Sequence, residues 1–174
     1  MSETKPEVKP EVASPAAPEA EAFSRLISRV TRKIAGRAVD ASLTGFLEAE
    51  FPPSGAIFQD IFEACKAGVA AGWMCAREAG GIKYGRVLKP SAATDGFSVD
   101  VVEMDEVAGP HHRHPKGEID MIMPLAGAPK FDGHGRGWFV YGPGSEHPPT
   151  VAGGRALVLY LLPDGAIEFT KPAN

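Results

Sequence analysis

The hydrophobic pattern of the chain changes at Gly80 and Gly81, and this change constrains the fold more than any other feature. Before the two glycines, large apolar residues recur at three- and four-residue steps, which is typical of amphipathic helices. After them, short apolar or alternating runs are separated by Gly, Pro and Asp, which is typical of antiparallel strands joined by turns. The sequence therefore predicts a mainly β protein with an N-terminal helical block.

The helical block is expected to contain three helices. The first covers residues 21–34 and presents one apolar face. A second, short helix is expected to have Asp40 or Ser42 as its N-cap, because both side chains can accept a hydrogen bond from a free backbone N–H. The third is expected to start at Ser54 and to run toward Trp73.

Three segments follow from these patterns. Residues 1–20 are mostly Pro, Glu, Ala and Lys, so they have too little apolar surface to offset the entropy of ordering and are predicted to form a flexible tail. Residues 21–79 form the helical region. Residues 80–174 form the β domain, in which seven or eight strands in about 90 residues fit a double-sheet jelly roll or a small barrel. The expected strands are residues 82–88, 97–104, 111–114, 119–125, 137–141, 156–162 and 166–169.

A cluster of histidines marks the candidate site, since residues 109–118 hold three of the five histidines in the chain. Residues two apart on a strand point to the same side, so His112 and His114 can face one point. Glu118 follows a Pro-Lys-Gly turn, and His147 follows a glycine-rich turn. Three imidazoles and one carboxylate suit a divalent transition metal, namely Fe, Mn, Ni, Co or Zn, with room left for water or substrate.

These residues also carry a family resemblance. The spacing His112-x-His114-x3-Glu118 resembles the first motif of the cupin family, and Gly144-x2-His147 resembles the core of the second. The chain departs from the family pattern because no Asn follows the last histidine. The resemblance implies that the β domain is a cupin-type jelly-roll β-barrel.

Four longer stretches narrow the resemblance. The segments at 117–120, 131–134, 137–147 and 162–169 resemble the 4-hydroxylaminobenzoate lyase family, and the likeness spans most of residues 21–170. The resemblance implies a metal-dependent conversion of 4-hydroxylaminobenzoate to 3,4-dihydroxybenzoate and ammonia, a step in bacterial nitroaromatic degradation. The small aromatic substrate is then the main partner.

Such a reaction needs a group that moves protons. Glu118 can do so if it is not a metal ligand, and Asp120, which faces the same way on the strand, is the alternative. His111, at the mouth of the histidine strand, is a third candidate for the catalytic base. Tyr141 is expected to reach the mouth of the site and contact the substrate.

The carboxylate of the implied substrate requires a cation, ideally an arginine that binds both oxygens. Arg86 and Arg113 are the candidates that we place in the substrate site, while Arg77 and Lys83 stay open as alternatives. Trp138 is expected to line an aromatic pocket.

Two other functions are compatible with the same ligands. One is a cupin dioxygenase that acts on a small aromatic, and the other is a regulatory cupin that binds a metal or small ligand without catalysis.

A net charge of −4 gives no reason to expect a nucleic-acid partner. No apolar run approaches the ~20 residues of a membrane span. We expect a cytoplasmic protein with two buried thiols, and a homo-oligomer, most simply a dimer.

Overall fold

The structure is a computed structural model that describes residues 17–171. The predicted flexible tail lies largely outside the described residues. Its last four residues, 17–20, are the first turn of helix α1, Ala17–Ile34, which therefore begins earlier than expected.

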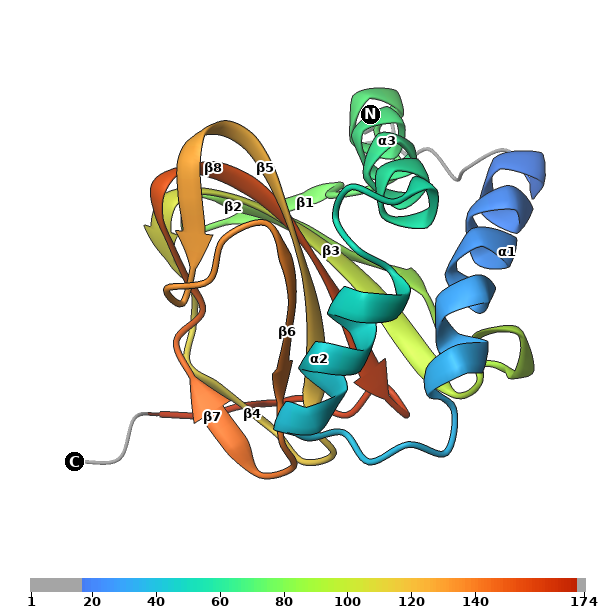
Figure 1. Cartoon of the computed structure of the whole chain (residues 1–174). Helices are drawn as coiled ribbons and strands as arrows, with labels where there is room; N and C mark the ends of the chain where they lie inside the picture. Colours follow the sequence, from blue (N-terminus) through green and yellow to red (C-terminus); the bar gives the residue numbers. More distant parts are fainter. Residues whose placement is uncertain (1–16, 172–174) are drawn as a thin grey trace, which may run out of the picture.

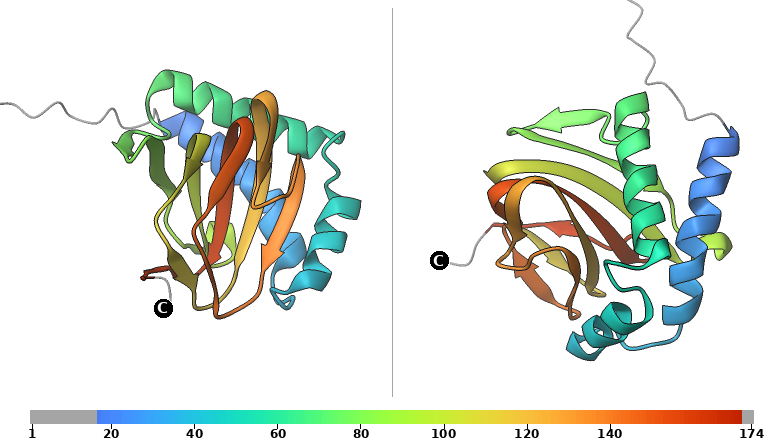
Figure 2. Two further views of the ribbon diagram at one scale, coloured as in Figure 1. Left: turned by 90° about the vertical axis from the view of Figure 1, so that its left-hand side faces the viewer. Right: turned by 45° about the horizontal axis from the view of Figure 1, so that its top comes forward.

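The described chain forms three layers (Figure 1). Helices α1, α2 (Ala41–Glu50) and α3 (Ala56–Ala71) cover one face of a six-stranded antiparallel sheet. A small three-stranded sheet faces the other side, and Figure 2 shows the large sheet curving around the space between the two sheets. No helix among residues 17–171 is long and apolar enough to cross a membrane.

The large sheet has the strand order β1-β2-β3-β8-β5-β6, and the small sheet has the order β7-β4-β9. The prediction of antiparallel β structure is confirmed. In sequence order the strands are β1 Arg77–Ala79, β2 Ile82–Leu88, β3 Phe97–Ala108, β4 His112–His114, β5 Glu118–Phe131, β6 Gly137–Tyr141, β7 Ser145–His147, β8 Thr150–Pro163 and β9 Glu168–Phe169, with a short 3-10 helix at Ala92–Thr94.

The two sheets are not joined into the closed barrel that the sequence predicts, because no strand pairing of the described residues connects them. The prolines that flank the short strands explain this. Pro110 and Pro115 bracket β4, and Pro148 and Pro149 follow β7. Proline has no N–H to donate to a neighbouring strand, so these strands end after three residues.

Two short strands were not expected. Strand β1 has the sequence Arg-Glu-Ala and is exposed along its length, so it has no apolar pattern that predicts a strand, and the predicted helical region 21–79 includes it. Strand β7 lies at the end of a Gly- and Pro-containing segment that reads as a turn. Both form through pairing with a neighbour, β1 with β2 and β7 with β4.

The helices begin and end for local reasons that the sequence partly shows. Asp40 is the N-cap of α2, as predicted, since its Oδ1 accepts a hydrogen bond from the Ser42 backbone N–H at 2.9 Å. Helix α3 has Gly55 rather than Ser54 at its N-cap. It ends at Gly72, whose φ of +84° lies in the left-handed region that glycine adopts without strain.

Alternation along the strands of the large sheet separates two hydrophobic cores. Val99 and Val101 of β3 pack with the helices, whereas Val102 and Met104 face the small sheet. On β5, Ile119 joins the first core. Glu118 and Asp120 alternate with it and must face the small sheet, so the fold brings both carboxyl groups to the space between the sheets.

Candidate metal centre

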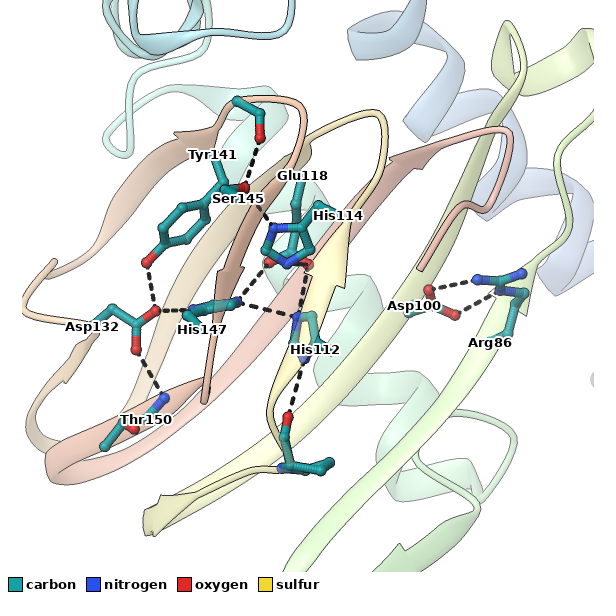
Figure 3. Close-up of polar contacts among 12 residues, drawn as sticks. Arg86, Asp100, His112, His114, Glu118, Asp132, Tyr141, Ser145, His147 and Thr150 are labelled. Carbon is teal, nitrogen blue, oxygen red and sulfur yellow. Dashed lines mark hydrogen bonds and ion pairs between the residues drawn. The ribbon is translucent and has the colours of Figure 1, made fainter. Parts of the chain in front are cut away.

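Three imidazoles and one carboxylate meet between the two sheets (Figure 3). His112 and His147 are directly opposite each other on β4 and β7, and His114 lies two residues along β4. Glu118 enters as the first residue of β5. All four side chains are buried, and one potential ligand atom from each lies within 4.8 Å of the other three.

The Nε2 atoms and the carboxylate surround one point. The Glu118 Oε2 atom lies 2.8 Å from His114 Nε2 and 3.4 Å from His112 Nε2. The Nε2 atoms of His147 and His112 are 3.2 Å apart. This spacing is compatible with donors that share one cation.

The other ring nitrogen of each histidine is held by a neighbour. His112 Nδ1 lies 3.2 Å from the Pro110 carbonyl oxygen, and His114 Nδ1 lies 2.9 Å from Ser145 Oγ. His147 Nδ1 contacts the Asp132 carboxylate. Such contacts fix the ring orientation of metal-binding histidines and leave Nε2 free to bind the ion.

Buried polar atoms without a hydrogen-bond partner support the fit of a cation. Within the described chain these atoms include His114 Nε2 and both carboxylate oxygens of Glu118. The short approach of His114 to Glu118 therefore lacks hydrogen-bond geometry. Because leaving buried polar groups unpaired is costly, and because this donor set suits divalent transition metals, the residues present fit a metal ion.

Glu118 and Asp120 are two buried carboxyl groups with opposite tendencies. Burial raises the pKa of Glu118, but His112 and His114 outweigh this effect and hold the pKa below its ordinary value. Burial and the neighbouring Glu118 charge raise the pKa of Asp120 well above its ordinary value. Neither oxygen of Asp120 has a hydrogen-bond partner within residues 17–171. The pair can thus hold one negative charge and one proton.

Asp132 is a site residue that the sequence reading did not single out. Its carboxylate contacts His147 Nδ1, accepts the Tyr141 hydroxyl proton and accepts the Thr150 backbone N–H at 2.9 Å. Burial raises its pKa, but these contacts outweigh burial and lower it. In the sequence, Asp132 is part of a Phe-Asp-Gly-His segment, where an Asp before a Gly is typical of a turn and gives no sign of a contact with His147.

A cavity of about 720 Å³ opens beside His112. Its wall includes Tyr160 and Asp100 of the large sheet and Phe169 of the small sheet. Arg86 also lines it, although the guanidinium is paired with Asp100, with the Arg86 Nε to Asp100 Oδ1 distance at 2.9 Å. The cavity can therefore hold a small molecule next to the histidine cluster.

The other predicted substrate residues divide into two groups. Tyr141 lies near the cluster, with its ring centroid 4.5 Å from that of His147. Trp138 does not line the cavity, which corrects the prediction, because it faces the helices and donates its indole N–H to the Phe51 carbonyl oxygen at 2.9 Å. Arg113 is also placed away from it, exposed beside Glu168.

The remaining candidate, His111, lies outside the four-residue cluster. Its side chain is half-buried, and its Nδ1 lies 2.8 Å from Thr170 Oγ1. Since it precedes His112, strand alternation turns it away from the other imidazoles. The geometry offers His111 no contact with the cluster.

Comparisons with known proteins show the family of this chain. The model of the PnbB family, described as 4-hydroxylaminobenzoate lyase, matches residues 25–169. The chain belongs to the 4-hydroxylaminobenzoate lyase family. It is 32% identical over 153 residues to the 4-hydroxylaminobenzoate lyase of Nocardioides sp. (strain LMS-CY) and 30% identical over 159 residues to that of Pseudomonas putida. Each match covers 82% of this chain and 90% of the relative, and the 4-hydroxylaminobenzoate lyase family membership identifies the chain as a lyase.

Solved structures show more distant likeness. The DMSP lyase DddQ from Ruegeria pomeroyi DSS-3 matches with a TM-score of 0.44 and 18% identity, covering 91% of this chain and 100% of that one. An RmlC-like cupin protein from Ralstonia eutropha JMP134 matches with a TM-score of 0.42 and 13% identity, covering 55% of this chain and 64% of that one.

Proposed function

We propose that this protein is a metal-dependent lyase that converts 4-hydroxylaminobenzoate to 3,4-dihydroxybenzoate and ammonia, as one step in nitroaromatic degradation. The observation that supports this most is the convergence of His112, His114, Glu118 and His147 in a chain of this family. The proposed reaction consumes one water molecule and balances without an external oxidant.

The four residues would hold the ion, and the open cavity beside His112 would hold the substrate. A divalent Fe, Mn, Ni, Co or Zn ion bound there supplies Lewis acidity toward an oxygen ligand. With Glu118 used as a ligand, the proton-moving role falls to Asp120. Its buried carboxyl group, two residues from Glu118 on the same face of β5, can give a proton to a departing oxygen or nitrogen and take one back.

Tyr141 has a supporting role in this proposal. Its hydroxyl group donates to Asp132, so it helps to hold the carboxylate that orients His147. His111 is not assigned a proton-transfer role, because it bonds to Thr170 instead.

The test is turnover of 4-hydroxylaminobenzoate by the purified, metal-loaded chain, with ammonia and 3,4-dihydroxybenzoate measured in equal amounts. The His112→Ala/His114→Ala variant should lose metal and turnover together. Asp120→Asn should retain metal but lose most turnover. Retention of full activity by the double histidine variant would end the proposal.

The dioxygenase alternative uses the same ligands and is separated by oxygen consumption. A lyase should turn over at the same rate without oxygen, whereas a dioxygenase should stop.

We also propose a cytoplasmic homodimer. Light scattering on the eluting protein tests the dimer, and a monomer mass would reject it.

A further inference from the structure

The wall of the cavity beside His112 includes an arginine, Arg77, that is separate from the metal cluster and from the Arg86–Asp100 pair. Arg77, on β1, lines the cavity and is exposed, and it forms no ion pair with any residue of the described range 17–171. A guanidinium at a cavity wall presents fixed donors that suit a carboxylate.

Strand register places Arg77 on the same side of the sheet as the metal cluster. Arg77 is opposite Tyr84, and Tyr84 is opposite Val102, whose side chain packs in the core between the sheets. Residues directly opposite on neighbouring strands share a face. Arg77 therefore faces the space between the sheets from its outer edge.

The other basic residues near this edge are engaged elsewhere. Arg86 donates to both carboxylate oxygens of Asp100, at 2.9 and 3.2 Å, and to the Gly165 carbonyl oxygen. Lys83 is opposite Glu103 and lies 3.8 Å from its carboxylate, on the alternate face of β2. Arg77 is thus the cation of this edge whose charge the described contacts leave available.

Exposed aromatic side chains line the same cavity as Arg77. Tyr84 and Phe169 are the large apolar side chains of the described chain that are exposed, at 37% and 70%, and both line this cavity. The Phe169 ring centroid is 6.0 Å from that of His112. Exposed apolar side chains gathered at one cavity are typical of a ligand site.

The same cavity reaches both Arg77 and the metal cluster, since Arg77 and His112 are both among its lining residues. In the proposed substrate, the carboxylate and the hydroxylamine group are para to each other, so a ligand in this cavity can present the two groups to different walls.

We propose that Arg77 binds the ring carboxylate of the substrate and that Tyr84 and Phe169 contact its ring, which makes Arg77 the residue that selects carboxylated aromatics. This inference rests on the proposed function for the identity of the substrate. It assigns specificity to β1, which contributes no candidate ligand to the metal cluster.

The test uses binding of two unreactive ligands, 4-hydroxybenzoate and 4-hydroxybenzamide, to the metal-loaded full chain by calorimetry. The wild type should bind the benzoate more tightly. Arg77→Ala should weaken benzoate binding by about 10- to 100-fold, the usual effect of losing a charge-assisted hydrogen bond, and should leave benzamide binding unchanged. Arg77→Lys should recover part of the loss.

Three further variants sharpen the result. Arg113→Ala removes an exposed arginine outside the cavity and should change neither affinity. Phe169→Ala should weaken both ligands by a similar factor, roughly 2- to 10-fold. If Arg86→Ala removes the preference for the carboxylate and Arg77→Ala does not, the assignment to Arg77 is wrong.

Tryptophan fluorescence gives a second readout, because Trp73 lines the cavity while the other tryptophan, Trp138, is buried against the helices. Quenching by the benzoate should disappear in Trp73→Phe. A wild type that binds neither ligand, or both equally, overturns the inference. Carboxylate selection by Arg77 in a protein that does not turn over 4-hydroxylaminobenzoate overturns the proposed function alone.

Discussion

At the scale of single residues, the candidate metal centre depends on groups behind the ligands as much as on the ligands. Asp132 contacts the ring nitrogen of His147 that points away from the cluster, and it also receives the Tyr141 hydroxyl and the Thr150 N–H. One carboxylate therefore joins the loop before β6, the end of β6 and the start of β8. Its loss should loosen His147 without removing a ligand.

Replacing Asp132 with Asn tests this role. Asn keeps the size of the side chain but removes the charge, so we expect metal affinity to fall by about 10- to 100-fold, as is typical for partners of metal-bound histidines. Competition with a chelator measures the change. Asp164→Asn is the matched control, since Asp164 pairs with Lys116 at the surface. Unchanged affinity in Asp132→Asn would contradict the role.

Asp100 provides a prediction about pH. Burial raises its pKa despite the ion pair with Arg86, so the folded protein holds this proton more tightly than the unfolded chain does. Asp100 therefore contributes to the free energy of unfolding below the pKa of the unfolded chain, about 3.9. This contribution is lost as the pH rises through the higher pKa that Asp100 has in the folded protein. The unfolding free energy of the wild type relative to Asp100→Asn should therefore increase as pH falls from 7 to 4. Urea titrations at several pH values measure it, and a difference that is flat or reversed would exclude the raised pKa.

At the scale of elements, the helices and the large sheet share a core on the face opposite the candidate site. Phe58 of α3 is fully buried, and its ring meets that of Trp138 edge to face with centroids 5.9 Å apart. Trp138 also receives support from α2, since the Glu48 carboxylate accepts its backbone N–H at 2.8 Å. The helices thus brace β5 and β6 from behind.

Phe58→Ala should reduce the free energy of unfolding by about 3–5 kcal/mol, because it leaves a cavity in this shared core. Ile57→Ala, at the half-buried neighbouring position, should cost less. Urea denaturation compares the two. Metal affinity of folded Phe58→Ala should be close to that of the wild type, because the histidines lie on the other side of the sheet; a large loss of affinity would show that the two faces are coupled.

At the scale of the whole molecule, we expect metal binding and folding to be linked, since the four candidate ligands come from three strands in two different sheets. A ligand that binds only the folded state adds stability, about 2.7 kcal/mol at a free concentration 100 times its dissociation constant. Removing the metal with a chelator should therefore lower the thermal midpoint, and adding it back should restore it.

A pair of histidine variants provides the comparison for this effect. His114→Ala should remove most of the metal-dependent increase in the thermal midpoint. His134→Ala should retain it, because His134 stacks on Phe139 outside the four-residue cluster. An equal increase in both variants would indicate that the metal stabilises the protein elsewhere.

Local sequence patterns are sufficient to predict the elements with strong periodicity and the four candidate metal ligands, whose spacing is regular. The bounds of β2 and β6, the N-cap of α2 and the buried group of His112, His114, Glu118 and His147 follow from local rules, because alternation and capping act over a few residues.

Features that depend on contacts between distant segments cannot be predicted from these local patterns. Trp138 and Tyr141 lie on one strand with aromatic side chains, but sheet packing sends the first toward the helices and leaves the second beside His147. The contact of Asp132 with His147 and the position of Arg77 at the cavity are further examples. Both depend on long-range contacts, and the pairing of exposed β1 with β2 has no signal in the local hydrophobic pattern. The separation of the two sheets depends on which backbone groups pair across the fold, and the prolines beside β4 and β7 limit that pairing.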